Sequence, residues 1–278
     1  MLRWLKGLGA RPAAVAEMQA RIAPELWRGV LCAHPFLQML DRAEAAQLQT
    51  RAAWLLASKH INGAQGLTLT DFMRLSIAAQ ACLPILNLSP ALYEGWDEII
   101  VYPAGFSIRR SHEDENGVVH EYVEEMAGEA WDGGPVILSW EDARHAEGAF
   151  NVVIHEFAHK LDQRAGMTDG MPDLSHDPGL QASAWQRVLE QSMAAFIAAL
   201  DAVEATIPPD VDPESAAAQP WYDQLPLDPY AASDAAEFFA VSSEQFFVAP
   251  APLAVALPEW YSLLKRYYQQ DPLQRLLP

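Results

Sequence analysis

The amino-acid sequence predicts an α+β protein that is mostly helical and carries a small mixed sheet. Three observations lead to this fold class. Several long stretches place apolar residues three and four positions apart, and two short runs of β-branched and aromatic residues are typical of strands. The third observation is a pair of histidines four residues apart within one of the helical stretches, a spacing that brings two side chains together on a helix.

Composition and net charge limit the kinds of function that the protein can have. The chain has 278 residues, of which 51% are hydrophobic, enough for a sizeable core in one large domain or two modest ones. Its 18 basic and 37 acidic residues give a net charge of −19, which argues against direct binding of nucleic acid or of an anionic membrane surface. The sequence shows neither a secretory signal nor a stretch long enough to span a membrane, so we expect a soluble cytoplasmic protein.

The first part of the chain is predicted to be helical. Residues 24–57 are rich in Ala, Leu, Gln, Arg and Glu at helical spacing, and residues 70–86 repeat this character, with Thr70 as a suitable N-cap. We expect residues 1–95 to form a helical part that packs on a second part at 96–278, the two forming one compact unit.

Strand-forming runs follow this helical part. Glu98–Pro103 is β-branched and aromatic and ends at a proline, which cannot donate to a ladder. Alternating residues around 118–123 predict a hairpin or a pair of short strands. After the turn signal at Gly133–Pro135, Val136–Trp140 is predicted to be a mostly buried strand. If it lies at an exposed edge, it could bind an extended peptide.

The remainder of the chain is predicted to be helical again. Apolar residues over 150–161 recur at spacings of three and four and predict a mostly buried helix, and a second helix is predicted over 182–205. Six prolines and several aspartates at 207–229 predict an extended surface loop. Two more helices are predicted, one from Asp234 to the prolines at 250 and 252 and one over 258–277.

His155, Glu156 and His159 form an HExxH motif in the first of these helices. Residues four apart lie one turn above one another, so both imidazoles can reach one ion. Glu156 is offset from the ligand face and can take a proton from water on the metal, which is the role of a general base. Burying these polar side chains without a partner would be costly, which favours a metal site over the alternative, a solvated polar stripe on a core helix.

A catalytic zinc ion needs a third protein ligand and an open position. The HExxHxxGxxH pattern is excluded, because Asp162 and Ala165 stand where its glycine and last histidine would be. Glu237 is the better candidate, because it starts a helix after the proline-rich loop and is followed by an apolar stripe that would pack on the core. Glu244, two turns further on the same face, is its competitor. The alternative for Glu237 is a capping-box glutamate that reaches back to the residue capping the helix.

The segments around these residues resemble the Mlc titration factor A family. The resemblance rests on Asn151–Asp162 and Tyr230–Phe247 and extends well beyond the HExxH motif. The family pattern usually has a proline at the position of Ala235, and Phe238 also varies, but neither change removes a ligating side chain. Three further segments look like family segments in the right order, so that the similarity covers most of the chain: Ile100–Pro103, Gly134–Trp140 and Tyr267–Arg275.

The resemblance implies a zincin-like core, similar to the protease domain of anthrax lethal factor, in which two histidines and a glutamate hold Zn²⁺. The implied ligands are His155, His159 and Glu237. It also implies aminopeptidase-like hydrolysis of short peptides. A regulatory role in sugar uptake is implied as well, because the family takes its name from sequestering a sugar-responsive transcriptional repressor.

Two further residues are candidates for supporting roles. Asp162 lies on nearly the same helix face as His159 and could accept the second N–H of an imidazole, with a surface or helix-terminal role as the alternative. Tyr230 could donate a hydrogen bond to the oxyanion of a tetrahedral intermediate, with a packed core tyrosine as the alternative. The predicted catalytic residues are therefore Glu156 and Tyr230.

Two functions are compatible with these features. The first is a zinc-dependent peptidase that hydrolyses peptide bonds through a water activated by the metal. The second is a binding protein that sequesters a repressor and whose peptidase activity is secondary or latent. The acidic composition would suit a basic, DNA-binding partner protein.

Overall fold

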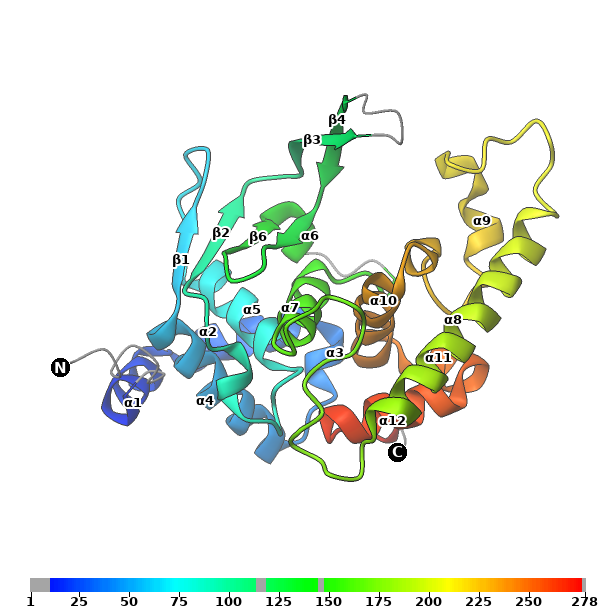
Figure 1. The fold of residues 1–278 in the computed structure, drawn as a ribbon. Helices are drawn as coiled ribbons and strands as arrows, with labels where there is room; N and C mark the ends of the chain where they lie inside the picture. Colours follow the sequence, from blue (N-terminus) through cyan, green and yellow to red (C-terminus); the bar gives the residue numbers. More distant parts are fainter. Residues whose placement is uncertain (1–10, 114–118, 145–147, 277–278) are drawn as a thin grey trace.

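The computed structural model describes residues 11–113, 119–144 and 148–276. Most of these residues are helical, and a small sheet lies among the helices (Figure 1), which confirms the predicted α+β class. Within the described residues, no helix is both long and apolar enough to cross a membrane.

The sheet has four strands in the order β1-β2-β6-β5. The first three run parallel, and β5 is antiparallel to β6. A separate antiparallel pair, β3 and β4, projects beyond the sheet in Figure 1 and forms the hairpin expected in this region. The strand bounds are β1 His60–Gly63, β2 Glu98–Tyr102, β3 Phe106–Glu113, β4 Val119–Met126, β5 Gly128–Ala130 and β6 Val136–Ser139.

The strand pairing corrects one expectation. The strand predicted at Val136–Trp140 is β6, but it pairs with β2 on one side and with β5 on the other, so it is not an edge strand. The edge strands are β1 and β5. The strand β5 was not predicted because its residues Gly-Glu-Ala include no β-branched or aromatic side chain. The strand β1, with the sequence His-Ile-Asn-Gly, contains a single β-branched residue and was also not predicted.

Five helices form the N-terminal part. The helix predicted over 24–57 is divided into three, because Pro35 keeps His34 extended and Asp41 caps a new helix by accepting from the backbone N–H groups of residues 43 and 44. Thr70 caps the last of the five as predicted. Their bounds are α1 Pro12–Arg21, α2 Pro24–Ala33, α3 Pro35–Gln38, α4 Arg42–Ser58 and α5 Asp71–Cys82.

The later helices surround the predicted motif. In Figure 1, α7 and α10 lie side by side in the middle of the molecule, between the sheet and the long helix α8. Pro250 ends α10 as predicted but also opens α11, since a proline at the first helical position loses no hydrogen bond. The bounds are α6 Trp140–Arg144, α7 Val152–Gln163, α8 Ala182–Glu204, α9 Gln219–Tyr222, α10 Ala235–Val248, α11 Pro250–Ala256 and α12 Pro258–Tyr268.

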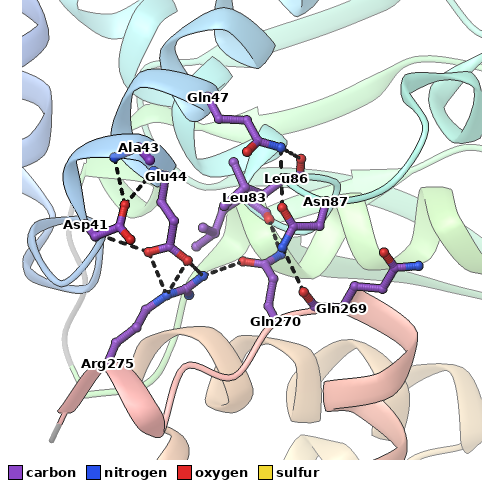
Figure 2. Close-up of polar contacts among 10 residues, drawn as sticks. All are labelled: Asp41, Ala43, Glu44, Gln47, Leu83, Leu86, Asn87, Gln269, Gln270 and Arg275. Carbon is purple, nitrogen blue, oxygen red and sulfur yellow. Dashed lines mark hydrogen bonds and ion pairs between the residues drawn. The ribbon is translucent and has the colours of Figure 1, made fainter.

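The C-terminal segment is tied to the N-terminal helices (Figure 2). The Arg275 guanidinium lies 2.7 Å from the carboxylate of Glu44 on α4, and it also donates to the side-chain oxygen of Gln270. Gln270 in turn donates to the carbonyl of Leu83, directly after α5, at 2.8 Å. One cluster of buried apolar residues runs through the N-terminal helices, the sheet and the C-terminal helices, so these ties reinforce a shared core.

Candidate metal centre

Helix α7 carries the HExxH motif at the centre of the molecule. Its N-cap is Asn151, whose side-chain oxygen accepts from the backbone N–H of Ile154 at 2.9 Å. Every residue from Val152 to Asp162 is buried, so the polar side chains of the motif are enclosed with the apolar ones. A solvated polar stripe, the alternative considered for this motif, does not describe a helix that is buried all round.

The two histidines and Glu237 converge. The Nε2 atoms of His155 and His159 are 3.1 Å apart, and the Glu237 Oε2 atom lies 3.1 Å from the first and 3.4 Å from the second. These three side chains form the one cluster of potential metal ligands found among the described residues. The structure thus brings together all three residues predicted as ligands, from two helices far apart in sequence.

Helix α10 places Glu237 in its first turn. Asp234 caps the helix by accepting from the backbone N–H groups of Ala236 and Glu237, at 2.8 and 2.9 Å. The cap is therefore supplied by the aspartate, and the Glu237 carboxylate faces the histidines of α7 instead of reaching back to the cap. The geometry favours the ligand interpretation of Glu237 over the capping-box alternative.

The cluster fits a zinc ion. Bonds of 2.0–2.1 Å in a tetrahedral site separate neighbouring ligand atoms by about 3.3 Å, close to the three separations here. Two imidazoles and one carboxylate are also a donor set that zinc accepts. The Glu237 Oε2 atom is buried and makes no hydrogen bond, as expected for an oxygen placed to ligate an ion.

The protonation of the ligands reflects their proximity. Burial alone would lower the pKa of His155, but the neighbouring carboxylates of Glu237 and Glu244 raise that pKa well above its usual value. Burial would likewise raise the pKa of Glu237, yet the neighbouring His155 and His159 hold it well below the usual range. The carboxylate of Glu237 is therefore negatively charged and can bind a cation.

Glu156 lies beside this cluster and is only 4% exposed. Burial raises the pKa of its carboxyl group to about 7, and its Oε2 atom has no hydrogen-bond partner. Gly128 on β5 makes room for it: a Cβ atom there would lie 2.7 Å from the Glu156 Cγ and 2.6 Å from a methyl of Val152. Sequence analysis missed this glycine, because the contact depends on how β5 packs against α7.

Glu244 contacts the opposite side of the His155 ring. Its Oε1 atom is 2.8 Å from His155 Nδ1, and its Oε2 atom accepts the backbone N–H of Asn151. The sequence offered Glu244 as a competitor for the third ligand position. In the structure this carboxylate lies behind the ligand instead of at the point where the ligands converge.

The two residues considered for supporting roles lie in different settings. Asp162 is fully buried, so a surface role is excluded, and it accepts the backbone N–H of Gly170 at 2.8 Å. Burial raises the pKa of its carboxyl group to about 6, and the helix-terminal interpretation fits it best. Tyr230 is 47% exposed, with its ring 6.2 Å from that of His155, so it is not a packed core tyrosine.

A cleft of about 710 Å³ opens at this site. His155, Glu156 and Tyr230 line it, together with apolar residues from several segments. Asp223 and Asp228, from the region predicted as an extended surface loop, add negative charge to its wall. No lysine or arginine occurs among the described residues that line the cleft, so it is electrostatically suited to cationic groups.

The fold and this site together indicate a metallopeptidase, and comparison with known families supports that class. The sequence model of the glucose-regulated metallo-peptidase M90 family matches residues 10–269, and the chain belongs to this family. The family recognised from the sequence motifs is thereby confirmed.

Relatives that match over nearly the whole chain are named Mlc titration factor A. The chain is 37% identical to the protein of this name from Serratia proteamaculans over 253 residues, which is 90% of this chain and 88% of the relative. It is 38% identical to that of Klebsiella pneumoniae over the same shares. The relative from Escherichia coli K12 is 36% identical over 245 residues, covering 87% of this chain and 85% of the relative.

Proposed function

We propose that the protein is a cytoplasmic zinc-dependent metallopeptidase with aminopeptidase-like activity. The observation that carries this proposal is the convergence of three ligand atoms from His155, His159 and Glu237 beside the buried carboxyl group of Glu156, whose Oε2 atom has no hydrogen-bond partner. A metal site that served only structure would not need that carboxylate, whereas hydrolysis needs a group that accepts and returns a proton.

His155, His159 and Glu237 would hold the ion. When bound, zinc lowers the pKa of a coordinated water to about 7 and polarises the scissile carbonyl. Glu156 takes the proton of the attacking water at Oε2 and delivers it to the leaving amine, and a pKa of about 7 suits both steps. Tyr230, at the cleft wall, donates its hydroxyl hydrogen to the oxyanion that forms when the carbonyl is attacked.

The charge of the cleft supports the aminopeptidase-like preference. An aminopeptidase must bind the free α-ammonium group of its substrate, and carboxylates are its natural partners. Asp223 and Asp228 line the cleft near the motif, each with one oxygen engaged within its own segment. Their second oxygens would be available to the ammonium group of a short peptide.

A second candidate function is sequestration of a sugar-responsive transcriptional repressor. It is favoured by the names of the relatives, each called a titration factor for Mlc, and by the glucose-regulated description of the family. A net charge of −19 would attract a basic, DNA-binding protein, and that attraction would weaken as salt is added. Peptidase activity and sequestration are compatible in one molecule.

One substitution separates the two functions. Glu156→Gln removes the general base but none of the ligands, so zinc content should stay near one ion per chain. Hydrolysis of aminoacyl nitroanilides should fall by at least a hundredfold. Repressor binding should be unchanged. Glu156→Gln protein that keeps its hydrolytic rate, or parent protein without bound zinc, would contradict the peptidase proposal.

A further inference from the structure

A chain of buried polar side chains runs from the metal centre into the N-terminal helices. It begins at His155, passes through Glu244 and Asn151, and ends at Gln80 on α5. All four residues are at least nine-tenths buried. The proposed mechanism uses only the first of them, so the other three need a separate explanation.

The first links fix the orientation of the imidazole. A carboxylate can only accept, so Glu244 Oε1 receives the Nδ1–H of His155 at 2.8 Å. In the neutral imidazole that binds a metal, this leaves the Nε2 lone pair directed at the ligand cluster. The other oxygen of Glu244 accepts the backbone N–H of Asn151. Both oxygens of this carboxylate are thus held, one by the histidine and one by the residue that caps its helix.

Gln80 fixes the next link. Its Nε2 donates to the carbonyl of Ala143 at 3.0 Å, so its Oε1 must face the other way, where it accepts from Asn151 Nδ2 at 2.8 Å. That contact leaves the Asn151 side-chain oxygen to cap α7. Donors and acceptors can be assigned in only one way along this chain. Exchanging the nitrogen and oxygen atoms of either side-chain amide would place two donors or two acceptors in contact.

We propose that Gln80 and Asn151 are positioning residues for the metal ligand His155, acting on it through Glu244. The inference rests on the proposed function, since it concerns the affinity of the site for zinc. Helix α5 supplies no ligand and does not line the cleft. Under this proposal it nevertheless helps to maintain the geometry of the metal centre. Partners that orient metal-binding histidines commonly affect metal affinity by about 10- to 100-fold.

Two variants interrupt the chain at different links. Gln80→Leu keeps a similar volume but removes both amide contacts. Asn151→Ser keeps a good N-cap for α7 and adds no charge, but it removes the donor to Gln80. Zinc affinity of each metal-free variant is measured by competition with a chromogenic chelator, and folding by circular dichroism. We expect both variants to bind zinc about 10- to 100-fold more weakly than the parent.

Gln270→Leu is the matched control. Gln270 is also a buried glutamine that donates to a main-chain carbonyl and accepts from a side chain, but its hydrogen bonds go to Leu83 and Arg275 and to none of the four residues of the buried chain (Figure 2). Its loss should lower the melting temperature of the metal-free protein about as much as Gln80→Leu does. Its zinc affinity should stay within twofold of the parent.

The outcomes distinguish the two proposals. Parent protein that binds no zinc would overturn the proposed function, and the positioning role with it. Parent binding with unchanged affinity in Gln80→Leu and Asn151→Ser would overturn the positioning role alone. An equal loss of affinity in Gln270→Leu would also overturn it, because general loosening of the fold would then account for the effect.

Discussion

Glu156 is a buried carboxyl group whose proposed catalytic role comes with a cost to the free energy of unfolding. Its carboxyl group is buried beside the cleft that it lines, with one oxygen lacking a hydrogen-bond partner, and burial raises its pKa from 4.5 to about 7. The HExxH letters identified it as a candidate general base. They could not predict its burial or the glycine that makes room for it, since both depend on the packing of β5 against α7.

The pH dependence of unfolding should reveal this carboxyl group. A carboxyl whose pKa is higher in the folded state favours folding only while it is protonated, so its contribution declines as pH rises from about 4.5 to 7. In metal-free protein, Glu156→Gln should remove that decline. The free energy of unfolding of the variant relative to the parent should therefore rise by about 3 kcal/mol over this range. Urea titrations at several pH values test this, and parallel pH profiles would contradict it.

At the scale of elements, the site depends on how helices α7 and α10 are placed relative to each other. The apolar spacing of residues 150–161 predicted α7 to within two residues at each end, and the aspartate before Glu237 marked the start of α10. Sequence alone favoured Glu237 over Glu244, because Glu237 starts a helix after the loop and is followed by an apolar stripe, but it left a capping role for Glu237 open. The family resemblance indicated Glu237, and the geometry agrees.

The cap of α10 should matter to the metal as well as to the fold. Asp234→Ala removes two hydrogen bonds to the first turn, which contains Glu237, and should cost about 1 kcal/mol of stability. Zinc affinity should also fall severalfold, because the ligand turn loosens. Asp41→Ala is the control: Asp41 caps α4 with the same two contacts but lies away from the ligands. Calorimetry and chelator competition should show equal destabilisation but weaker zinc binding only in Asp234→Ala.

At the scale of the whole molecule, helices from both ends of the chain share one core. The C-terminal residues bind α4 and α5, and α5 is joined to the cap of the motif helix. Such contacts between distant segments leave no periodic trace in the sequence, so they could not be predicted from it. The division of the chain near residue 95 stays a prediction.

Zinc should stabilise the whole molecule if the ligands belong to one folding unit. A ligand present at a hundredfold over its dissociation constant adds about 2.7 kcal/mol to the free energy of unfolding. Zinc should thus raise the single melting transition of the parent, and a chelator should reverse the rise. Glu237→Ala should show little response, whereas Glu259→Ala, a substitution on α12 outside the ligand cluster, should respond like the parent. A zinc response retained by Glu237→Ala would contradict the assigned ligand set.

The separation of the ligands along the chain has a consequence for biosynthesis. During translation the two histidines of α7 emerge well before Glu237 on α10. The nascent protein therefore offers a passing ion only an incomplete pair of imidazoles on an unsupported helix. With the proposed ligand set, stable metal uptake must therefore await the synthesis of helix α10, which carries Glu237.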